Sequence, residues 1–424
     1  MSLDAFVYGM FDFAFYYPLF MSYVWATGAI YYFFYREQSD HRRPDNPPPL
    51  TETPPVTFLV PCHNEGENAE STLRSLLSQN YPDFEVIAIN DASSDDTGAR
   101  LEQMAAEEPR LRVIHFPANQ GKAMGLRMGA MAAQHEYLIC LDGDALLDRH
   151  ATQWMVRHFI EGHRVGAVTG NPRVRNRTTL LGKIQVGEFS SIIGLIKRAQ
   201  RIYGRVFTVS GVVAAFRKTA LQQIGYWNID MVTEDIDVSW RLQLNHWDIR
   251  YEPNALCWIL MPETYKGLWR QRLRWAQGGI EVFFRYWKEL LQWKSRRMWV
   301  VGLELVVSTI WAYTIGAISL LWLIGLITPL QPPYVVSSIL PGWAGVILGS
   351  TCLIQFGVSL AIDSRYEPAL SRFYYWMIWY PTIYWMIHSA ATIVAVPKTL
   401  IKRRGQRAIW VSPDRGIRPG ATET

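Results

Sequence analysis

The sequence predicts an α/β domain with a mostly parallel sheet, joined at both ends to α-helical transmembrane segments. Between residues 51 and 294, short β-rich runs alternate with helical patterns, which is typical of right-handed βαβ units. Outside this stretch, several apolar runs lack Asp, Glu, Lys and Arg and are long enough to cross the roughly 30 Å hydrocarbon core of a bilayer. These runs are residues 13–35, 305–330, 334–362 and 373–397.

The first apolar run predicts a permanent membrane helix rather than a cleaved signal peptide, because no basic segment precedes it and no small-residue cleavage site follows it. Basic residues follow this run and precede the next one: Arg36, His41, Arg42, Arg43, Lys294, Arg296 and Arg297. The positive-inside rule then places the central domain in the cytoplasm.

The carboxyl end allows two topologies. Three crossings after the domain would place the basic residues from Lys398 to Arg407 outside, against the positive-inside rule, whereas two crossings would keep them inside. Pro381 interrupts the last apolar run, so a broken or re-entrant element there would also satisfy the rule. Both alternatives stay open.

Composition limits the partners and the redox chemistry. The net charge of +5 is modest and concentrated beside the apolar runs, which favours contact with the lipid bilayer over nucleic-acid binding. The four cysteines have no CxxC spacing, so we expect free thiols and neither a disulfide framework nor a zinc site.

The expected elements of the central domain are short and regularly spaced. We predict strands at residues 56–62, 85–91, 111–116 and 137–144, and helices at 68–79, 97–107 and 122–134. Asp91 ends the second of these strands, and Asp142, Gly143 and Asp144 end the fourth. Because ligands of such sheets bind beyond the carboxyl ends of the strands, we expect these carboxylates to share one edge.

Asp142 and Asp144 predict a site for Mg²⁺ or Mn²⁺ that bridges to a diphosphate, because hard cations prefer carboxylate and phosphate oxygens. Gly143 between them would let a bulky ligand approach the backbone. The alternative is an ordinary acidic turn, since the short motif also occurs by chance.

Asp91 precedes a turn, where its carboxylate would accept hydrogen bonds from a uracil or ribose, and His63 and Glu65 after the first strand would line the same pocket. Lys122 opens a predicted helix, where a cation gains nothing from the helix dipole. It therefore suits a diphosphate contact, with a solvated lysine as the alternative.

Thr233, Glu234 and Asp235 precede a helical run. Thr233 is expected to be the N-cap, and acidic residues in a first turn are ordinary complements of the helix dipole. The functional interpretation is that Asp235, kept ionised there, takes the proton of an attacking sugar hydroxyl as a general base. Because neither this motif nor its neighbours shows a second carboxylate that must serve as a nucleophile, single displacement with inversion is the simpler mechanism.

Gln271, Arg274 and Trp275 lie in a segment rich in Trp and Arg, residues 268–293, just before the next apolar run. The pattern is typical of an interfacial amphipathic helix. It also brings together an indole that can stack on a sugar and an arginine that can bind diphosphate oxygens.

These four motifs, in this order, resemble the signature of the processive, inverting family 2 glycosyltransferases, which include cellulose, chitin and hyaluronan synthases. Longer stretches are similar to the branch that makes poly-β-1,6-N-acetylglucosamine, among them VTGNPRVR, MVTEDIDVSWRLQLN, LWRQRLRWAQGG and WVSPDRG. The chain departs from that branch in beginning with a single apolar run.

The resemblance implies a nucleotide-sugar-binding GT-A fold and a bacterial inner-membrane enzyme that polymerises UDP-N-acetylglucosamine into a biofilm exopolysaccharide and feeds the growing polysaccharide outward. By this resemblance, Asp91 contacts the nucleotide, Asp142 and Asp144 bind the metal and the diphosphate, and Asp235 is the general base. The last motif, Gln271, Arg274 and Trp275, positions the donor diphosphate and the acceptor. Glu234 and Asp144 join Asp235 as catalytic candidates. A small two-span membrane subunit and cyclic di-GMP as regulator are implied in the same way.

With this resemblance the chain divides into six parts: an N-terminal transmembrane helix (1–36), a Pro-rich linker (37–55), the GT-A domain (56–262), interfacial helices (263–298), a C-terminal transmembrane region (299–398) and a basic tail (399–424). The alternatives are a synthase of another β-linked polymer, a transferase that loads one sugar onto a polyprenyl phosphate, and a nonenzymatic nucleotide-sugar-binding membrane protein.

Overall fold

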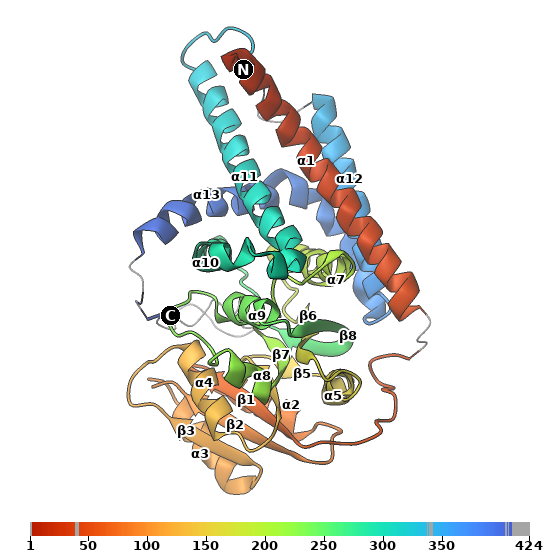
Figure 1. Cartoon of the computed structure of the whole chain (residues 1–424), viewed down its shortest axis with the longest axis vertical. Coiled ribbons are helices and arrows are strands. Elements are labelled where there is room, and N and C mark those ends of the chain that lie inside the picture. The colour runs from red at the N-terminus through yellow and green to blue at the C-terminus, as the bar shows by residue number, and fades with distance from the viewer. Residues whose placement is uncertain are drawn as a thin grey trace.

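The computed structural model describes residues 2–38, 42–336, 338, 342–402, 405, 407 and 408, without the side chains of Thr382 and Ile383. An eight-stranded sheet with helices on both faces forms one end of the molecule (Figure 1). Three long helices project from the other end, and helices that lie across the molecule separate the two parts.

The first half of the sheet is parallel and confirms the predicted βαβ units. Its strands are β1 (Val56–Cys62), β2 (Phe84–Asn90), β3 (Leu111–His115) and β4 (Tyr137–Leu141). They alternate with α2 (Glu67–Leu77), α3 (Thr97–Glu107) and α4 (Lys122–Ala132). The order β3-β2-β1-β4 places β1 between β2 and β4, so the chain changes direction across the sheet there.

The second half mixes directions. It contains β5 (Leu146–Leu147), β6 (Val165–Val174), β7 (Val213–Arg217) and β8 (Asp248–Ile259). β7 is antiparallel to β4 and β6, and β5 is antiparallel to β8, whereas β6 and β8 are parallel. The sheet is therefore mostly parallel, as predicted.

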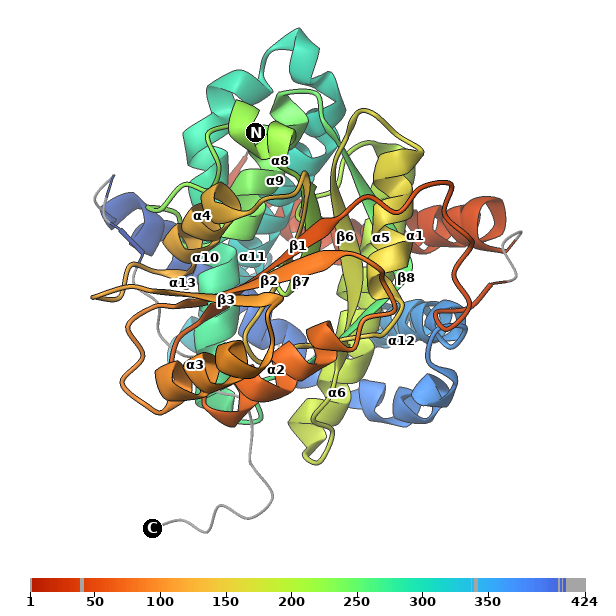
Figure 2. The ribbon, with the colours of Figure 1, turned by 90° about the horizontal axis from the view of Figure 1, so that it is seen from below.

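Helices cover both faces of the sheet (Figure 2). Phe58 packs in one core with α2, α3 and α5 (Ala151–Ile160), whereas the next residue, Leu59, packs in another with α4, α8 (Lys218–Gln223) and α9 (Glu234–Leu244). Consecutive strand residues point to opposite faces, which explains why a continuously apolar strand such as β1 is buried on both sides.

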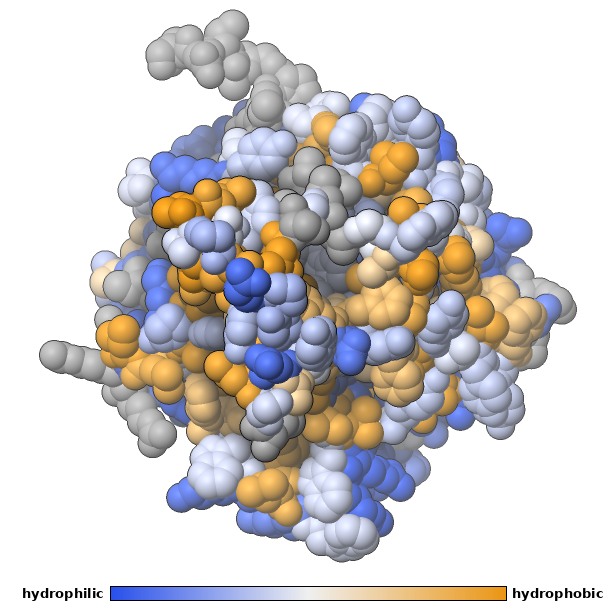
Figure 3. All heavy atoms as spheres, turned by 90° about the horizontal axis from the view of Figure 1, so that it is seen from above, coloured by the Kyte–Doolittle hydropathy of each residue, from blue (hydrophilic) through white to orange (hydrophobic). Residues whose placement is uncertain are grey.

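The projecting helices are α1 (Leu3–Tyr32), α11 (Trp299–Gly325) and α12 (Gly342–Asp363) (Figure 1). Among the described residues, two helical stretches are long and apolar enough to cross a membrane, 293–325 and 342–363. α1 is longer than α12 but is not one of these two stretches. Apolar side chains gather at the surface seen from above (Figure 3).

The last apolar run does not form one continuous helix. It forms η4 (Pro368–Trp379), η5 (Tyr380–Tyr384, containing Pro381) and α13 (Trp385–Ile401). α13 lies across the molecule beside α10 (Tyr265–Leu290) rather than along α11 (Figure 1). The interruption expected at Pro381 is therefore present, and the number of membrane crossings in this region stays a prediction.

A buried group of charges, the junction cluster, joins the sheet domain to the projecting helices. Arg198 in α7 (Lys197–Tyr203) contacts Glu37 Oε1 through Nε at 2.7 Å and Asp363 Oδ1 through Nη1 at 2.9 Å. Arg173 Nη1 of β6 contacts Asp363 Oδ2 at 2.9 Å. Glu37 follows α1 and Asp363 ends α12, so the cluster fixes both helices to the sheet.

Candidate active site

Most of the predicted site residues meet at one cavity of about 560 Å³. It is lined by Lys122, Asp142, Asp144, Glu234, Asp235, Gln271, Arg274 and Trp275. These residues come from the ends of strands, the starts of α4 and α9, and the side of α10. Asp142 and Asp144 therefore line one cavity together with residues of α4, α9 and α10, whereas Asp91, which was expected beside them, is not part of the lining.

Lys122 is the electrostatic centre of this edge. Its Nζ lies 2.5 Å from Asp142 Oδ1 and 3.0 Å from Glu234 Oε1, and it donates to Gly211 O at 3.0 Å. Burial by itself would lower the pKa of Lys122, but the two carboxylates, Asp142 first, raise that pKa above its ordinary value. The alternative of a solvated lysine is therefore wrong.

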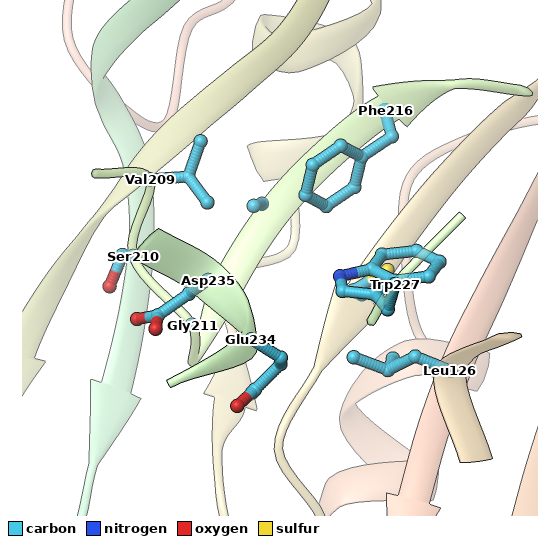
Figure 4. Close-up of a pocket in the computed structure, with 10 residues that line it drawn as sticks. Leu126, Val209, Ser210, Gly211, Phe216, Trp227, Glu234 and Asp235 are labelled. Carbon is cyan, nitrogen blue, oxygen red and sulfur yellow. The ribbon is translucent and has the colours of Figure 1, made fainter. Parts of the chain in front are cut away.

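Glu234 and Asp235 are neighbours with different environments. Burial opposes ionisation of Glu234, but Lys122 outweighs it and lowers the pKa of Glu234. Burial, and then the charge of Glu234, raise the pKa of Asp235 to about 6. Figure 4 shows Asp235 beside Ser210 and Glu234 on the side of Leu126. Asp235 is thus the carboxyl group of this pair that can exchange a proton near neutral pH.

Asp91 has a structural contact that the sequence did not predict. Its fully buried carboxylate accepts the backbone N–H of Gln120 at 2.6 Å and that of Gly121 at 2.8 Å, which holds the loop before α4. His63 Nδ1 lies 2.7 Å from Asp91 O. His63, Glu65 and Asp91 lie outside the lining of the 560 Å³ cavity, and their contact with a nucleotide stays a prediction.

Gly143 has a packing role that the sequence did not predict. A Cβ at this position would lie 3.0 Å from Glu65 Cγ and 3.1 Å from Cys62 Sγ. The close packing against the end of β1 therefore favours a glycine here, and the approach of a ligand to its backbone stays a prediction.

The carboxylates of this site could hold a divalent cation only together with oxygen atoms of a bound ligand. The described residues contain no group of three or more His, Cys, Asp or Glu side chains placed to hold a metal ion. Asp142 and Asp144 line the cavity, and two carboxylates completed by diphosphate oxygens and water are the usual set for Mg²⁺. These residues therefore fit a metal that arrives with a nucleotide diphosphate.

Thr233 occupies the N-cap of α9, as predicted, but its side chain makes no capping hydrogen bond. It packs against α10 at Gly278, where a Cβ would overlap the Thr233 side chain. The absence of a side chain at Gly278 thus allows α9 and α10 to approach closely, and this approach places Asp235 opposite the later motif.

The two arginines of the later motif have separate roles. Arg274 is exposed toward the cavity, whereas Arg272 is buried, contacts Glu188 Oε2 at 2.5 Å and lies 4.4 Å from the ring centroid of Trp275. Residues two apart on a helix point in different directions. Arg272 therefore packs on the Trp275 indole and supports its position. The third residue of the motif, Gln271, has a buried Oε1 with no hydrogen-bond partner among the described atoms.

Sequence reasoning missed two residues at the cavity. Gly211 packs so closely on Asp235 that a Cβ would lie 2.9 Å from Oδ2. Lys197 lines the cavity from a buried position. The only sequence signal for Lys197 is a lysine that directly follows the apolar run IIGLI.

Comparison with known proteins decides the family. Residues 54–278 match the family model described as glycosyltransferase like family 2. The chain is 42% identical over 408 residues to a poly-β-1,6-N-acetyl-D-glucosamine synthase of Staphylococcus epidermidis, covering 96% of this chain and 98% of that one. The chain is a family 2 glycosyltransferase.

Two further matches support this glycosyltransferase assignment. The synthase of the same name from Staphylococcus aureus strain COL is 42% identical over 412 residues, with 96% and 98% coverage. The solved structure of the mannosyltransferase PcManGT from Pyrobaculum calidifontis, in complex with GDP-mannose and Mn²⁺, matches with a TM-score of 0.63 at 20% identity, covering 94% of this chain and 99% of that one. The latter shows that the GT-A-like fold is shared.

Proposed function

We propose that this glycosyltransferase polymerises N-acetylglucosamine from UDP-N-acetylglucosamine into poly-β-1,6-N-acetylglucosamine. The observation that carries the proposal is the 42% identity to the staphylococcal synthases over nearly the whole of both chains. The proposal is also supported by the residues that line one cavity, because they are suited to glycosyl transfer: Asp142, Asp235, Arg274 and Trp275.

In the proposed reaction, the C6 hydroxyl of the acceptor sugar attacks C1 of the donor sugar. The glycosidic bond forms as the bond from C1 to the diphosphate breaks, and the hydroxyl proton passes to Asp235. A pKa of about 6 leaves Asp235 ionised at neutral pH but close enough to accept this proton. Glu234 is paired with Lys122 and is not placed to act as a nucleophile, which supports single displacement with inversion.

Asp142 and Asp144 would hold Mg²⁺ or Mn²⁺ together with the donor diphosphate. When bound, the cation supplies positive charge that stabilises the departing UDP. The cavity needs such charge, because its lining includes five carboxylates and only three basic side chains: Asp142, Asp144, Glu234, Asp235 and Glu304 against Lys122, Lys197 and Arg274. Synthesis should stop on chelation and return with Mg²⁺ or Mn²⁺; full activity in excess chelator, with no retained metal, would contradict this assignment.

The same cavity continues between the apolar helices, which supports a membrane exit for the polymer. Its lining includes Trp25 of α1, Trp311 of α11, Gln355 of α12 and His388 of α13. We infer that α1, α11 and α12 cross the bacterial inner membrane and that α13 lies on its cytoplasmic side. This arrangement keeps the catalytic domain and the basic tail in the cytoplasm, in agreement with the positive-inside rule.

The small two-span subunit and cyclic di-GMP remain part of the proposal. Arginines of the tail are suitable phosphate ligands, although WVSPDRG lies outside the described residues. The described Arg407 contacts Gln120, which also holds Asp91. Reconstitution in liposomes with and without the subunit and the nucleotide tests this part, because equal synthesis in all four conditions would show that the chain needs neither.

A donor panel tests the central proposal. Purified chain in lipid vesicles would receive labelled UDP-N-acetylglucosamine, UDP-glucose, UDP-glucuronate or GDP-mannose with Mg²⁺. We expect polymer from UDP-N-acetylglucosamine alone. Polymer from another donor would assign a different polysaccharide, and transfer of a single sugar to lipid would favour the polyprenyl-phosphate alternative.

A further inference from the structure

The buried side chain of Lys197 lies beside the active site, and the proposed mechanism gives it no role. Lys197 is the first residue of α7 and directly follows the π-helical segment η2 (Ser190–Ile196). Its side chain is only 3% exposed, yet it lines the cavity that also contains Asp235. π-Helical turns are rare and are frequently found at functional sites.

The contacts of Lys197 lead to the proposed base. Its Nζ donates to Thr169 Oγ1 at 2.9 Å, and the same hydroxyl oxygen accepts the N–H of Ser210 at 2.8 Å. Ser210 precedes Gly211, whose backbone packs on the Asp235 carboxylate. Lys197 is therefore tied to the turn that supports Asp235.

Lys197 differs from Lys122 in its charge partners. Lys122 has two carboxylates in ion-pair range, whereas Lys197 has none within the described part of the chain. An ammonium group has three donors, and Thr169 takes one. Burial lowers the pKa of Lys197 to about 7, with Asp235 partly opposing the shift, so the free enzyme stabilises its charge poorly.

The position of Lys197 indicates which substrate supplies the missing hydrogen-bond acceptors for its ammonium group. Gln200, three residues further along the same helix, donates to Glu304 Oε2 of α11 at 3.3 Å. Lys197 and Gln200 thus line the cavity toward the apolar helices, whereas Lys122 and Asp142 lie at the edge of the sheet. In the proposed reaction the donor diphosphate lies with Lys122 and Asp142, which leaves the side of Lys197 for the acceptor chain.

We propose that Lys197 positions the acceptor sugar, by donating hydrogen bonds to hydroxyl or amide oxygens of the last residue of the growing chain so that its attacking hydroxyl faces Asp235. This inference rests on the proposed function. Lys197 forms no covalent bond to the sugar and takes no proton from it; the proton passes to Asp235, and UDP leaves as before.

The test compares Lys197→Met, Lys197→Arg and the control Lys266→Met, which changes an exposed lysine of α10. We expect Lys197→Met to lower kcat at least ~100-fold because the hydroxyl is misplaced. The KM for UDP-N-acetylglucosamine and the Kd for UDP should stay within about threefold, because the donor side is intact. Lys197→Arg should recover at least ~10-fold of kcat, since a donor is restored, and the control should match the wild type.

Melting temperature separates positioning from a structural role. Replacing a buried, poorly paired amine by an apolar side chain of similar length should leave the Tm unchanged or raise it. A kcat within threefold of the wild type in Lys197→Met, or a parallel loss of UDP affinity and Tm, would overturn the inference. If the wild-type chain itself makes no polymer from UDP-N-acetylglucosamine, the proposed function fails and this inference fails with it.

Discussion

The molecule contains two groups of largely buried charge that do different things. The junction cluster pairs Arg173 and Arg198 with Glu37 and Asp363, and its side chains are 5% exposed or less. The active-site cluster places Asp142, Glu234 and Asp235 around Lys122, beside a cavity. The first is neutral and closed, whereas the second has excess negative charge and is accessible.

This difference explains the separate consequences of the two clusters. A neutral, closed cluster satisfies its own charges and fixes the helices that it joins. A cluster with excess negative charge is completed only by a ligand. Burial first, and then the neighbouring charge of Glu234, raise the pKa of its least well paired member, Asp235. Chemistry is therefore expected at the second cluster and stability at the first.

Breaking the junction should give the largest effect on stability. Arg198→Met leaves two buried carboxylates without this guanidinium, and removing one partner of a buried pair costs about 3–5 kcal/mol. We expect a clearly lower Tm in detergent or nanodiscs. Arg100→Met is the matched control, because Arg100 lies in a surface network where solvent screens each ion pair, so its loss should change the Tm little. An unchanged Tm in Arg198→Met would remove the distinction between the clusters.

Neutralising the base should affect activity without loss of stability. Asp235→Asn removes the proton acceptor, so kcat for polymer synthesis should fall by ~100-fold or more while UDP still binds. Because the fold raises the pKa of Asp235, the ionised form is disfavoured in the folded state, and the uncharged asparagine should leave the Tm unchanged or higher. Near wild-type synthesis in this variant would show that another group is the base.

The smallest effect is a shift of the pH profile. Asp235 must be ionised to act, so kcat should fall as the pH drops through about 6, by ~10-fold per unit below it. Glu234 contributes to the raised pKa of Asp235, so Glu234→Gln should move this acid limb to lower pH, whatever its effect on the maximal rate. An acid limb at the same pH in both proteins would mean that it reports another group.

Local patterns were enough to predict the elements that position the site. The helix starts at Lys122 and Glu234 follow from residues nearby in sequence. The two strands that lead to the site also follow from apolar runs, although they end at Asn90 and Leu141 rather than at the predicted residues 91 and 144. The convergence of their side chains then follows from parallel pairing. The GT-A assignment required the family resemblance in addition.

The remaining features depend on contacts that sequence spacing does not show. Arg198 lies 161 residues from Glu37 and 165 from Asp363, so no local pattern reveals the junction cluster. The tight packing that favours a glycine at position 143 involves other elements of the fold. The same holds for Thr233, whose side chain packs on α10 and makes no capping hydrogen bond. Arg272 is an exception, because helical periodicity alone separates it from Arg274.

Linkage analysis of the product tests the central claim most directly. Purified chain in vesicles would extend labelled UDP-N-acetylglucosamine, and the polymer would be analysed by methylation and by digestion with a β-1,6-specific N-acetylglucosaminidase. The account predicts long chains with β-1,6 linkages. Polymer with β-1,3 or β-1,4 linkages, or a product of one added sugar, would contradict it.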